Sequence, residues 1–336
     1  MTQLVELQNA LPLFDEAGIK LYAISYDDVA ALEAFAEARG ITYDLLADEG
    51  SKTIREFGIL NHHIPETEVP FYGIPFPGTY LVDEDGIITA KAFHHHLAQR
   101  ESPEGLIDAA LGEVLLRGNE PSTSSDADAS GISFSMAYRG GGGVSRVGQI
   151  RHLIIRAELP DGLHIYDEPV PVGMQATTFT LAGPQGLRIE PVQAPSTETL
   201  ELPGVGALQV WSGDVDFVIP IWSTSDVATE SDATGNKVAR IEVDVAYQAC
   251  DDQACSLPTT TRLSVTVPVD PVLTSTPEVD DERPSFDQRK WMQEKVLAAL
   301  ETTPDADAAM AFLATTNEHL KANRQVLRGR SAEAHR

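Results

Sequence analysis

The chain has 336 residues, enough for two domains with separate cores, and its 51 acidic residues outnumber its 24 basic residues. The net charge of −27 argues against nucleic acids and anionic membrane surfaces as partners, because both require basic patches. No apolar run approaches the ~20 residues of a membrane span. The N-terminus lacks a charged and then apolar signal pattern, which predicts a cytoplasmic protein, although a truncated start would leave the periplasm open.

Residues 1–117 are predicted to form an α/β domain, because helical and strand patterns alternate along them. Leu4, Leu7, Leu11 and Phe14 recur at helical spacing before Gly18. The predicted strands lie at residues 19–25, 77–83 and 87–93, and the predicted helices at about residues 3–17, 28–40, 51–57 and 103–116.

The pattern changes after residue 117. Residues 118–131 are mainly Ser, Asp, Ala and Pro without an apolar period, which predicts a flexible linker. Residues 132–270 contain many short strand patterns bounded by Gly, Pro and Asp, and this spacing predicts an antiparallel β-sandwich. Ser285 and Gln288 form a capping box at the start of a helical segment predicted over residues 285–328.

The only two cysteines of the chain, Cys250 and Cys255, lie in a turn of the predicted sandwich. Alternating apolar and polar residues precede them at 240–247 and follow them at 262–267, which predicts two strands of a β-hairpin. Facing positions of a hairpin bring Cα atoms to roughly 4.5–5.5 Å, within reach of a disulfide. The two sulfurs can therefore bond to each other. No second cysteine or histidine pair follows at ligand spacing, so a zinc site is not expected.

Residues 3–116 resemble the AhpC/TSA peroxiredoxin family of the thioredoxin superfamily. The resemblance is carried by the order and spacing of several short pieces, namely residues 3–8, 23–27, 35–37, 45–48, 57–59 and 77–86. It implies a thioredoxin-like fold and a reactive cysteine at the N-terminus of the first long helix, where the helix dipole lowers the thiol pKa. It also implies that Pro77 lies beside the active site in a cis peptide bond; a trans proline that opens a strand is the alternative.

This segment departs from the family at its central residue, because no cysteine precedes Cys250. Either the first strand and the cysteine turn belong upstream of Met1, or the segment is a degenerate, non-catalytic module. We favour a truncated start, because a sheet without its first central strand would expose apolar surface and unpaired backbone groups.

Residues 132–269 resemble the N-terminal domain of DsbD, the thiol:disulfide interchange protein, at residues 162–166 and at 247–258. This resemblance implies an immunoglobulin-like sandwich with a redox-active cysteine pair and a thiol or disulfide protein partner, such as a thioredoxin-like protein. Asp251 and Asp252 oppose a neighbouring thiolate, and no Lys, Arg or His lies between the cysteines. His164 and Tyr166 are expected to face solvent near the cysteines or to belong to a plain strand.

We therefore expect a thiol–disulfide oxidoreductase that exchanges electrons through Cys250 and Cys255, with Pro77 as a third site residue and a possible peroxiredoxin-type antioxidant role. The chain as given cannot itself be a cysteine peroxidase. No cofactor and no metal are expected; the tract from His94 to His96 is interpreted as a polar strand end. The alternative is a non-catalytic module that binds a redox partner and carries a structural disulfide.

Overall fold

The computed structural model describes residues 2–64, 66, 72–94, 99–202, 206–224, 226–251 and 253–270. Its residues form two compact units, which are described separately below. One consists of the described residues of Met1–Lys20 and Gly78–Ser275, and the other of those of Leu21–Pro77. The helical segment predicted over residues 285–328 lies outside the described residues, as do His95, His96 and Asp252.

The smaller unit pairs two short strands in parallel, β1 (Tyr22–Ser25) with β2 (Asp44–Ala47). Between them runs α3 (Val29–Arg39), which begins at Asp28, whose carboxylate accepts the N–H of Ala31 at 2.7 Å, and ends at Gly40 with a φ of 62°. Helix α4 (Lys52–Glu56) follows β2. This βαβ order agrees with the α/β class expected for the first part of the chain.

In the larger unit, three helices and a hairpin accompany the sandwich strands. The helices are α1 (Thr2–Asn9), α2 (Leu11–Glu16) and α5 (Pro103–Leu111), and the hairpin joins β3 (Gly78–Val82) to β4 (Ile88–Phe93). The single helix predicted at residues 3–17 is thus two helices, because Pro12 in the first turn of α2 has no N–H to continue the ladder. Helix α5 stops earlier than predicted, at Gly112, whose φ is 74°.

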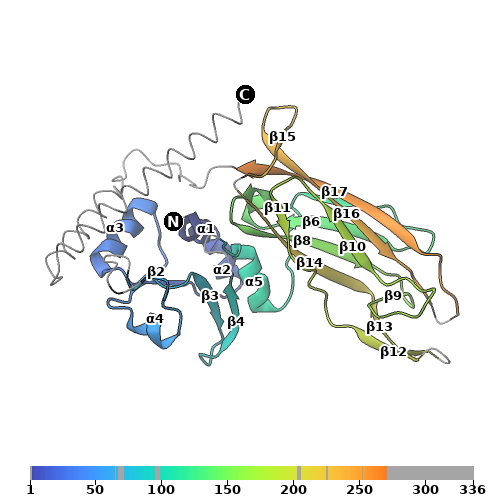
Figure 1. Ribbon diagram of the computed structural model, residues 1–336, viewed down its shortest axis with the longest axis horizontal. Coiled ribbons are helices and arrows are strands. Elements are labelled where there is room, and N and C mark those ends of the chain that lie inside the picture. Colours follow the sequence, from blue (N-terminus) through green and yellow to red (C-terminus); the bar gives the residue numbers. More distant parts are fainter. Residues whose placement is uncertain are drawn as a thin grey trace. The chain divides into compact units, whose positions relative to one another are not determined.

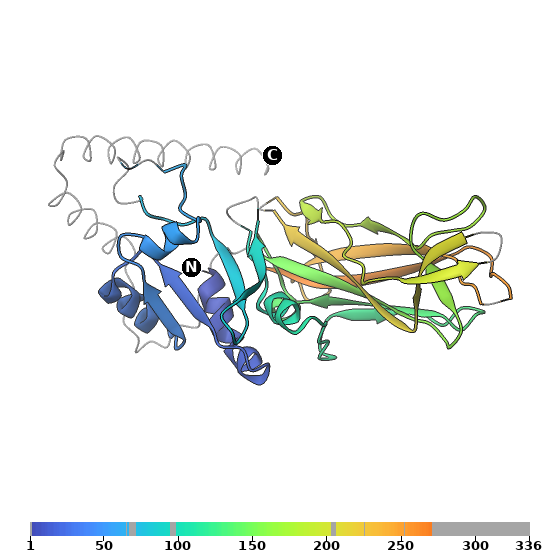
Figure 2. The ribbon, with the colours of Figure 1, turned by 90° about the horizontal axis from the view of Figure 1, so that it is seen from below.

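Two five-stranded sheets form the sandwich (Figures 1 and 2). The first has β10 (Thr178–Ala182), β16 (Lys237–Tyr247), β17 (Thr259–Asp270), β7 (Ser145–Arg146) and β15 (Glu230–Ser231). The second has β11 (Leu187–Ile189), β14 (Asp214–Ser223), β8 (Ile150–Glu158), β6 (Ser133–Arg139) and β5 (Ser122–Ser124). A three-stranded sheet, β12 (Glu198–Leu202), β13 (Gly206–Ser212) and β9 (His164–Tyr166), lies beside them.

Alternating side chains of both large sheets share one core. Ile155 and Phe217 of the second sheet and Val243 and Val265 of the first belong to the same cluster, and each is less than 5 % exposed. This shared core agrees with the predicted antiparallel sandwich. Residues 118–131 differ from the predicted flexible linker, because Ser122–Ser124 pair with β6 and Asp128 accepts the N–H groups of Ser130 and Ile132. No helix among the described residues has the length and apolar character to cross a membrane.

Candidate functional site

The two cysteines lie at the turn that joins β16 to β17. The two strands pair from Val238 with Pro268 to Tyr247 with Thr259, and beyond this last pair Cys250 faces Cys255 across the turn. Their Cα atoms are 4.0 Å apart and their sulfurs form a disulfide. This pairing agrees with the hairpin that the alternating sequence pattern predicts.

Asp251 closes the turn between the cysteines. Its carboxylate accepts the backbone N–H groups of Gln253 and Ala254, each at 2.7 Å, and its own N–H donates to the carbonyl of Ala254 at 2.9 Å. These hydrogen bonds hold the pKa of Asp251 below its ordinary value, Gln253 contributing most, and the charge of His164 acts in the same direction. The negative charge of Asp251 therefore interacts with backbone N–H groups of the turn and with His164.

Strand β9 brings His164 beside Cys250. The N–H of each residue donates to the carbonyl of the other at 3.0 Å, so the two form a directly opposed antiparallel pair. Opposed residues carry their side chains on the same face, with Cβ atoms about 4.5–5.5 Å apart. Because Cys250 also opposes Cys255, the residues form a row across three chain segments in the order His164, Cys250, Cys255.

The two cysteines differ in burial. Cys250 is 2 % exposed and packs in an apolar cluster with Tyr166, Leu208 and Val210, whereas Cys255 is exposed. Leu257, two residues further on, is 85 % exposed. The disulfide thus joins a buried cysteine to an exposed one.

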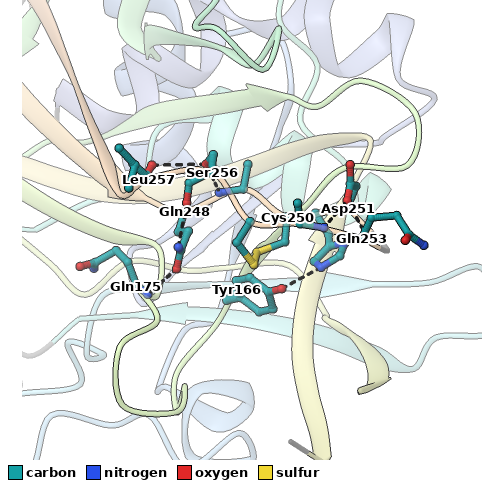
Figure 3. The surroundings of a disulfide bond; sticks show 12 residues. Tyr166, Gln175, Gln248, Cys250, Asp251, Gln253, Ser256 and Leu257 are labelled. Carbon is teal, nitrogen blue, oxygen red and sulfur yellow. Dashed lines mark hydrogen bonds between the residues drawn. A yellow bond between two sulfur atoms is a disulfide. The ribbon is translucent and has the colours of Figure 1, made fainter. Parts of the chain in front are cut away.

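Polar contacts on the other side of the pair fix the hairpin to the sandwich (Figure 3). The amide of Gln248 donates to the carbonyl of Ser256 at 2.8 Å and accepts the N–H of Gln175 at 3.0 Å. The hydroxyl of Ser256 accepts the N–H of Ala249 at 3.2 Å. Hydrogen bonds therefore hold the chain on both sides of the cysteine turn in place.

Two family models match the chain, the AhpC/TSA family over residues 1–91 and the N-terminal domain of thiol:disulfide interchange protein DsbD over residues 144–267. Residues 1–91, called the AhpC/TSA segment below, are thus similar to the first family, and residues 144–267, called the DsbD segment, are similar to the second. Both resemblances drawn from the sequence are thereby confirmed.

The curated relatives are chloroplastic peroxiredoxins Q. The chain is 30 % identical to that of Arabidopsis thaliana over 86 residues, which are 26 % of this chain and 37 % of the relative. It is 31 % identical to that of Gentiana triflora over 110 residues, which are 32 % of this chain and 45 % of the relative. The chain thus spans less than half the length of these curated relatives.

Two solved structures are similar to parts of the chain. The N-terminal periplasmic domain of ScsB from Proteus mirabilis aligns with a TM-score of 0.31 and 14 % identity, over 53 % of this chain and 59 % of that one. The reduced N-terminal domain of DsbD from Neisseria meningitidis aligns with a TM-score of 0.22 and 15 % identity, over 34 % of this chain and 81 % of that one.

Pro77, at the end of the smaller unit, differs from the expected cis proline. Glu168–Pro169 is the one cis peptide bond among the described residues, so the bond from Phe76 to Pro77 is trans. Pro77 directly precedes β3 and follows Phe76, whose N–H donates to the carbonyl of Ile59 at 2.6 Å. It is therefore the strand-opening proline of the alternative interpretation. Its place beside an active site of the AhpC/TSA segment stays a prediction.

His164 and Tyr166 belong to the plain strand β9, which was one of the two expectations for them. His164 is 7 % exposed and Tyr166 is fully buried, and the His164 Nε2 and Tyr166 hydroxyl atoms are hydrogen-bonded at 2.9 Å. Burial raises the pKa of Tyr166. Neither side chain faces solvent, which excludes the other expectation. Strand β9 pairs with β13 along one edge and with the cysteine hairpin along the other.

Sequence reasoning also missed the histidine beside the cysteines, because it looked for a basic residue only within the turn. His164 lies within residues 162–166, which carry the DsbD resemblance. The spacing of the sequence does not reveal that this residue pairs with Cys250. Within the described residues, no group of three or more His, Cys, Asp or Glu side chains is arranged to hold a metal ion.

Proposed function

We propose that the protein is a thiol–disulfide oxidoreductase whose Cys250–Cys255 disulfide exchanges electrons with a protein dithiol. The observation that carries the proposal is the unequal burial of the pair, with Cys250 2 % exposed and Cys255 exposed on a turn. Exchange requires a sulfur that a partner thiolate can approach and a second sulfur that leaves and later resolves the mixed disulfide. The pair meets both requirements.

The proposed reaction begins at Cys255. A partner thiolate attacks the Cys255 sulfur, the bond to Cys250 breaks, and its electron pair leaves with the Cys250 sulfur. The second thiol of the partner then attacks its own sulfur in the mixed disulfide and releases Cys255. Two electrons and two protons pass from the partner dithiol to the pair, and the partner becomes a disulfide.

The partner is a thiol or disulfide protein of the thioredoxin type. Both matched segments belong to families of thiol–disulfide redox proteins, which supports this partner class. If the AhpC/TSA segment acts in a peroxiredoxin-type antioxidant system, Pro77 would lie beside a cysteine supplied from outside residues 1–336, because Cys250 and Cys255 are the only cysteines in the chain.

The reduction potential of the pair tests the proposal. Thiol trapping across a glutathione or dithiothreitol series should give a potential in the range of known exchange proteins, roughly −120 to −270 mV. A potential below about −300 mV would identify a structural disulfide and overturn the proposal. The variant Cys250→Ser should accumulate a mixed disulfide between Cys255 and a thioredoxin-type protein, whereas Cys255→Ser should accumulate far less.

The alternative function is a docking module with a structural disulfide. It is favoured by the absence of any cysteine from residues 1–249, which leaves the AhpC/TSA segment without a thiol of its own. In that case, variants that lack the disulfide would bind a redox partner as well as the wild type does.

A further inference from the structure

The row of His164, Cys250 and Cys255 gives the buried cysteine a neighbour that can carry positive charge. Resting on the proposed function, we propose that His164 is the acid–base partner of the Cys250 sulfur. As an imidazolium, it would protonate the Cys250 thiolate when the disulfide opens. As a neutral imidazole, it would remove that proton when Cys250 attacks.

The backbone register places His164 beside Cys250. The two reciprocal hydrogen bonds of 3.0 Å fix His164 directly opposite Cys250, and the next bridge places Cys255 on the far side of Cys250. A side chain opposed in this way is a nearest neighbour on the same face of the sheet. The histidine is therefore adjacent to the buried sulfur residue, the one that leaves in the proposed reaction.

The Cys250 side chain is buried among apolar neighbours. Cys250 packs against Tyr166, Leu208 and Val210, and a thiolate released among these apolar side chains is poorly solvated. Such a thiolate is favoured only by a nearby cation or a proton donor. Among the described residues of the turn itself there is no Lys, Arg or His. His164 supplies from a separate strand the group that the turn lacks.

The groups near His164 come from the cysteine turn, from its own strand and from β13. Asp251 of the cysteine turn is attracted to the positive charge of His164, and this attraction is mutual. On its own strand, His164 bonds through Nε2 to the Tyr166 hydroxyl at 2.9 Å, an interaction drawn as the dashed line from Tyr166 in Figure 3. On β13, Ser212 lies opposite His164, and its hydroxyl donates to Glu198 of β12 at 3.3 Å. Asp251 is thus an acidic group that interacts with His164, and Ser212 is the neighbour of His164 on β13.

The proton and electron pair balance within this site. When a thiolate attacks Cys255, the electron pair of the broken disulfide passes to the Cys250 sulfur, and the imidazolium of His164 donates its proton to that sulfur. The products are a mixed disulfide at Cys255, a Cys250 thiol and a neutral His164. In the reverse direction, neutral His164 takes the proton and Cys250 attacks the mixed disulfide.

The pH profile of reduction by dithiothreitol tests this role in the full-length protein. With rates expressed per dithiothreitol thiolate, the wild-type rate constant should fall about tenfold between pH 5.5 and 8, because an imidazole loses its proton in this range. His164→Gln should show a flat profile and a rate about tenfold lower than wild type at pH 6. His152→Gln, which replaces a buried histidine of β8, is the matched control and should keep the wild-type profile. A wild-type profile in His164→Gln would overturn the inference.

A second measurement needs no variant. Proton titration of the histidine rings by NMR in the oxidised and reduced wild-type protein should give different midpoints for His164, because only the reduced protein has a titrating Cys250. His152 should titrate alike in both states. Identical His164 midpoints would overturn the inference, whereas a reduction potential below about −300 mV would overturn the proposed function itself. The two failures are therefore distinguishable.

Discussion

The two ends of the long strand β17 (Thr259–Asp270) hold polar groups in different ways. Before its first residue lies the disulfide turn, whose Asp251 and Cys255 are exposed. At its last residue, roughly 36 Å away at the usual strand rise, Asp270 bonds to Arg146, and Arg146 bonds to Glu6 of α1 at 3.0 Å. Glu6 also accepts a hydrogen bond from the guanidinium of Arg151 at 2.6 Å, and the Arg151 side chain is 1 % exposed.

Under the proposed function, the first end holds the residues that react and the second end holds residues that stabilise the fold. The buried charges of Arg151 and Glu6 form a close pair, and Arg146 is a second, more exposed cation at Glu6. The removal of Arg151 therefore leaves the buried Glu6 carboxylate only partly compensated. The disulfide closes a turn of only a few residues in a sandwich that already has a continuous core of both sheets. We therefore expect substitutions in the disulfide turn to abolish exchange activity with little loss of stability. Substitutions at Arg151 or Glu6 should lower the stability of the fold.

The largest effect is expected for Arg151→Met. It leaves Glu6 buried without its closest cation and should lower the free energy of unfolding by about 3–5 kcal/mol, measured by urea denaturation. Adding Glu6→Leu should recover much of this loss, because the buried carboxylate is then removed as well. If the double variant is as unstable as the single one, packing of the Arg151 side chain and not charge balance is the cause.

A smaller effect on stability is expected when both cysteines are replaced. The double variant Cys250→Ala and Cys255→Ala should lose roughly 2 kcal/mol, because closing so short a loop restricts the unfolded chain only slightly. Its exchange with a dithiol should be abolished. The comparison uses oxidised wild-type protein, and a loss above about 4 kcal/mol would show that the disulfide is mainly structural.

The strands at these two ends were predictable from sequence, but their tertiary partners were not. The period-two pattern at residues 240–247 and 262–267 predicts the hairpin of β16 and β17, because each strand has one buried face. The pairing of His164 with Cys250 depends on the register of a third segment, which local patterning leaves undetermined. The same limit applies to Glu6 and Arg151, which are 145 residues apart in sequence.

The predicted boundaries of helices were also wrong where a single residue interrupts a periodic apolar pattern. The apolar period continues through Leu11 and Phe14, yet Pro12 divides the helix predicted at residues 3–17. Strand β5 was missed because Ser122–Ser124 lack apolar side chains and are ordered by backbone bonds to β6. The cysteine pair was predictable because its evidence lies within one hairpin.

The buried carboxyl group of Glu101 makes the stability of the protein depend on pH. Burial raises the pKa of Glu101 to about 7, against an ordinary value of 4.5. The folded protein therefore binds more protons than the unfolded chain between these values, and the stability contributed below pH 4.5 is lost as the pH rises towards 7. His152, whose Nε2 lies 3.6 Å from the carboxylate, opposes this trend, because burial lowers its pKa to about 4.

Glu101→Gln should remove the Glu101 part of this dependence. Above pH 7 it should raise the free energy of unfolding by roughly 1–2 kcal/mol relative to wild type, less than the full shift implies because Arg151 attracts the carboxylate. Near pH 5 the two proteins should be similar. Urea denaturation from pH 5 to pH 8 measures the difference, and parallel curves would mean that Glu101 is ionised in the folded protein throughout.

The smallest effect is expected near the disulfide end, for Tyr247→Phe. The Tyr247 hydroxyl donates to Asp128 at 2.7 Å, while its ring packs 4.8 Å from that of Phe134 between centroids. The variant keeps the ring contact and should lose about 1 kcal/mol, because Asp128 retains the two N–H donors of its own turn. Its rate of reduction by dithiothreitol should equal that of wild type. A loss of 3 kcal/mol or more would mean that a buried polar contact at this end matters as much as the ion pairs at the other, and the contrast between the two ends of β17 would fail.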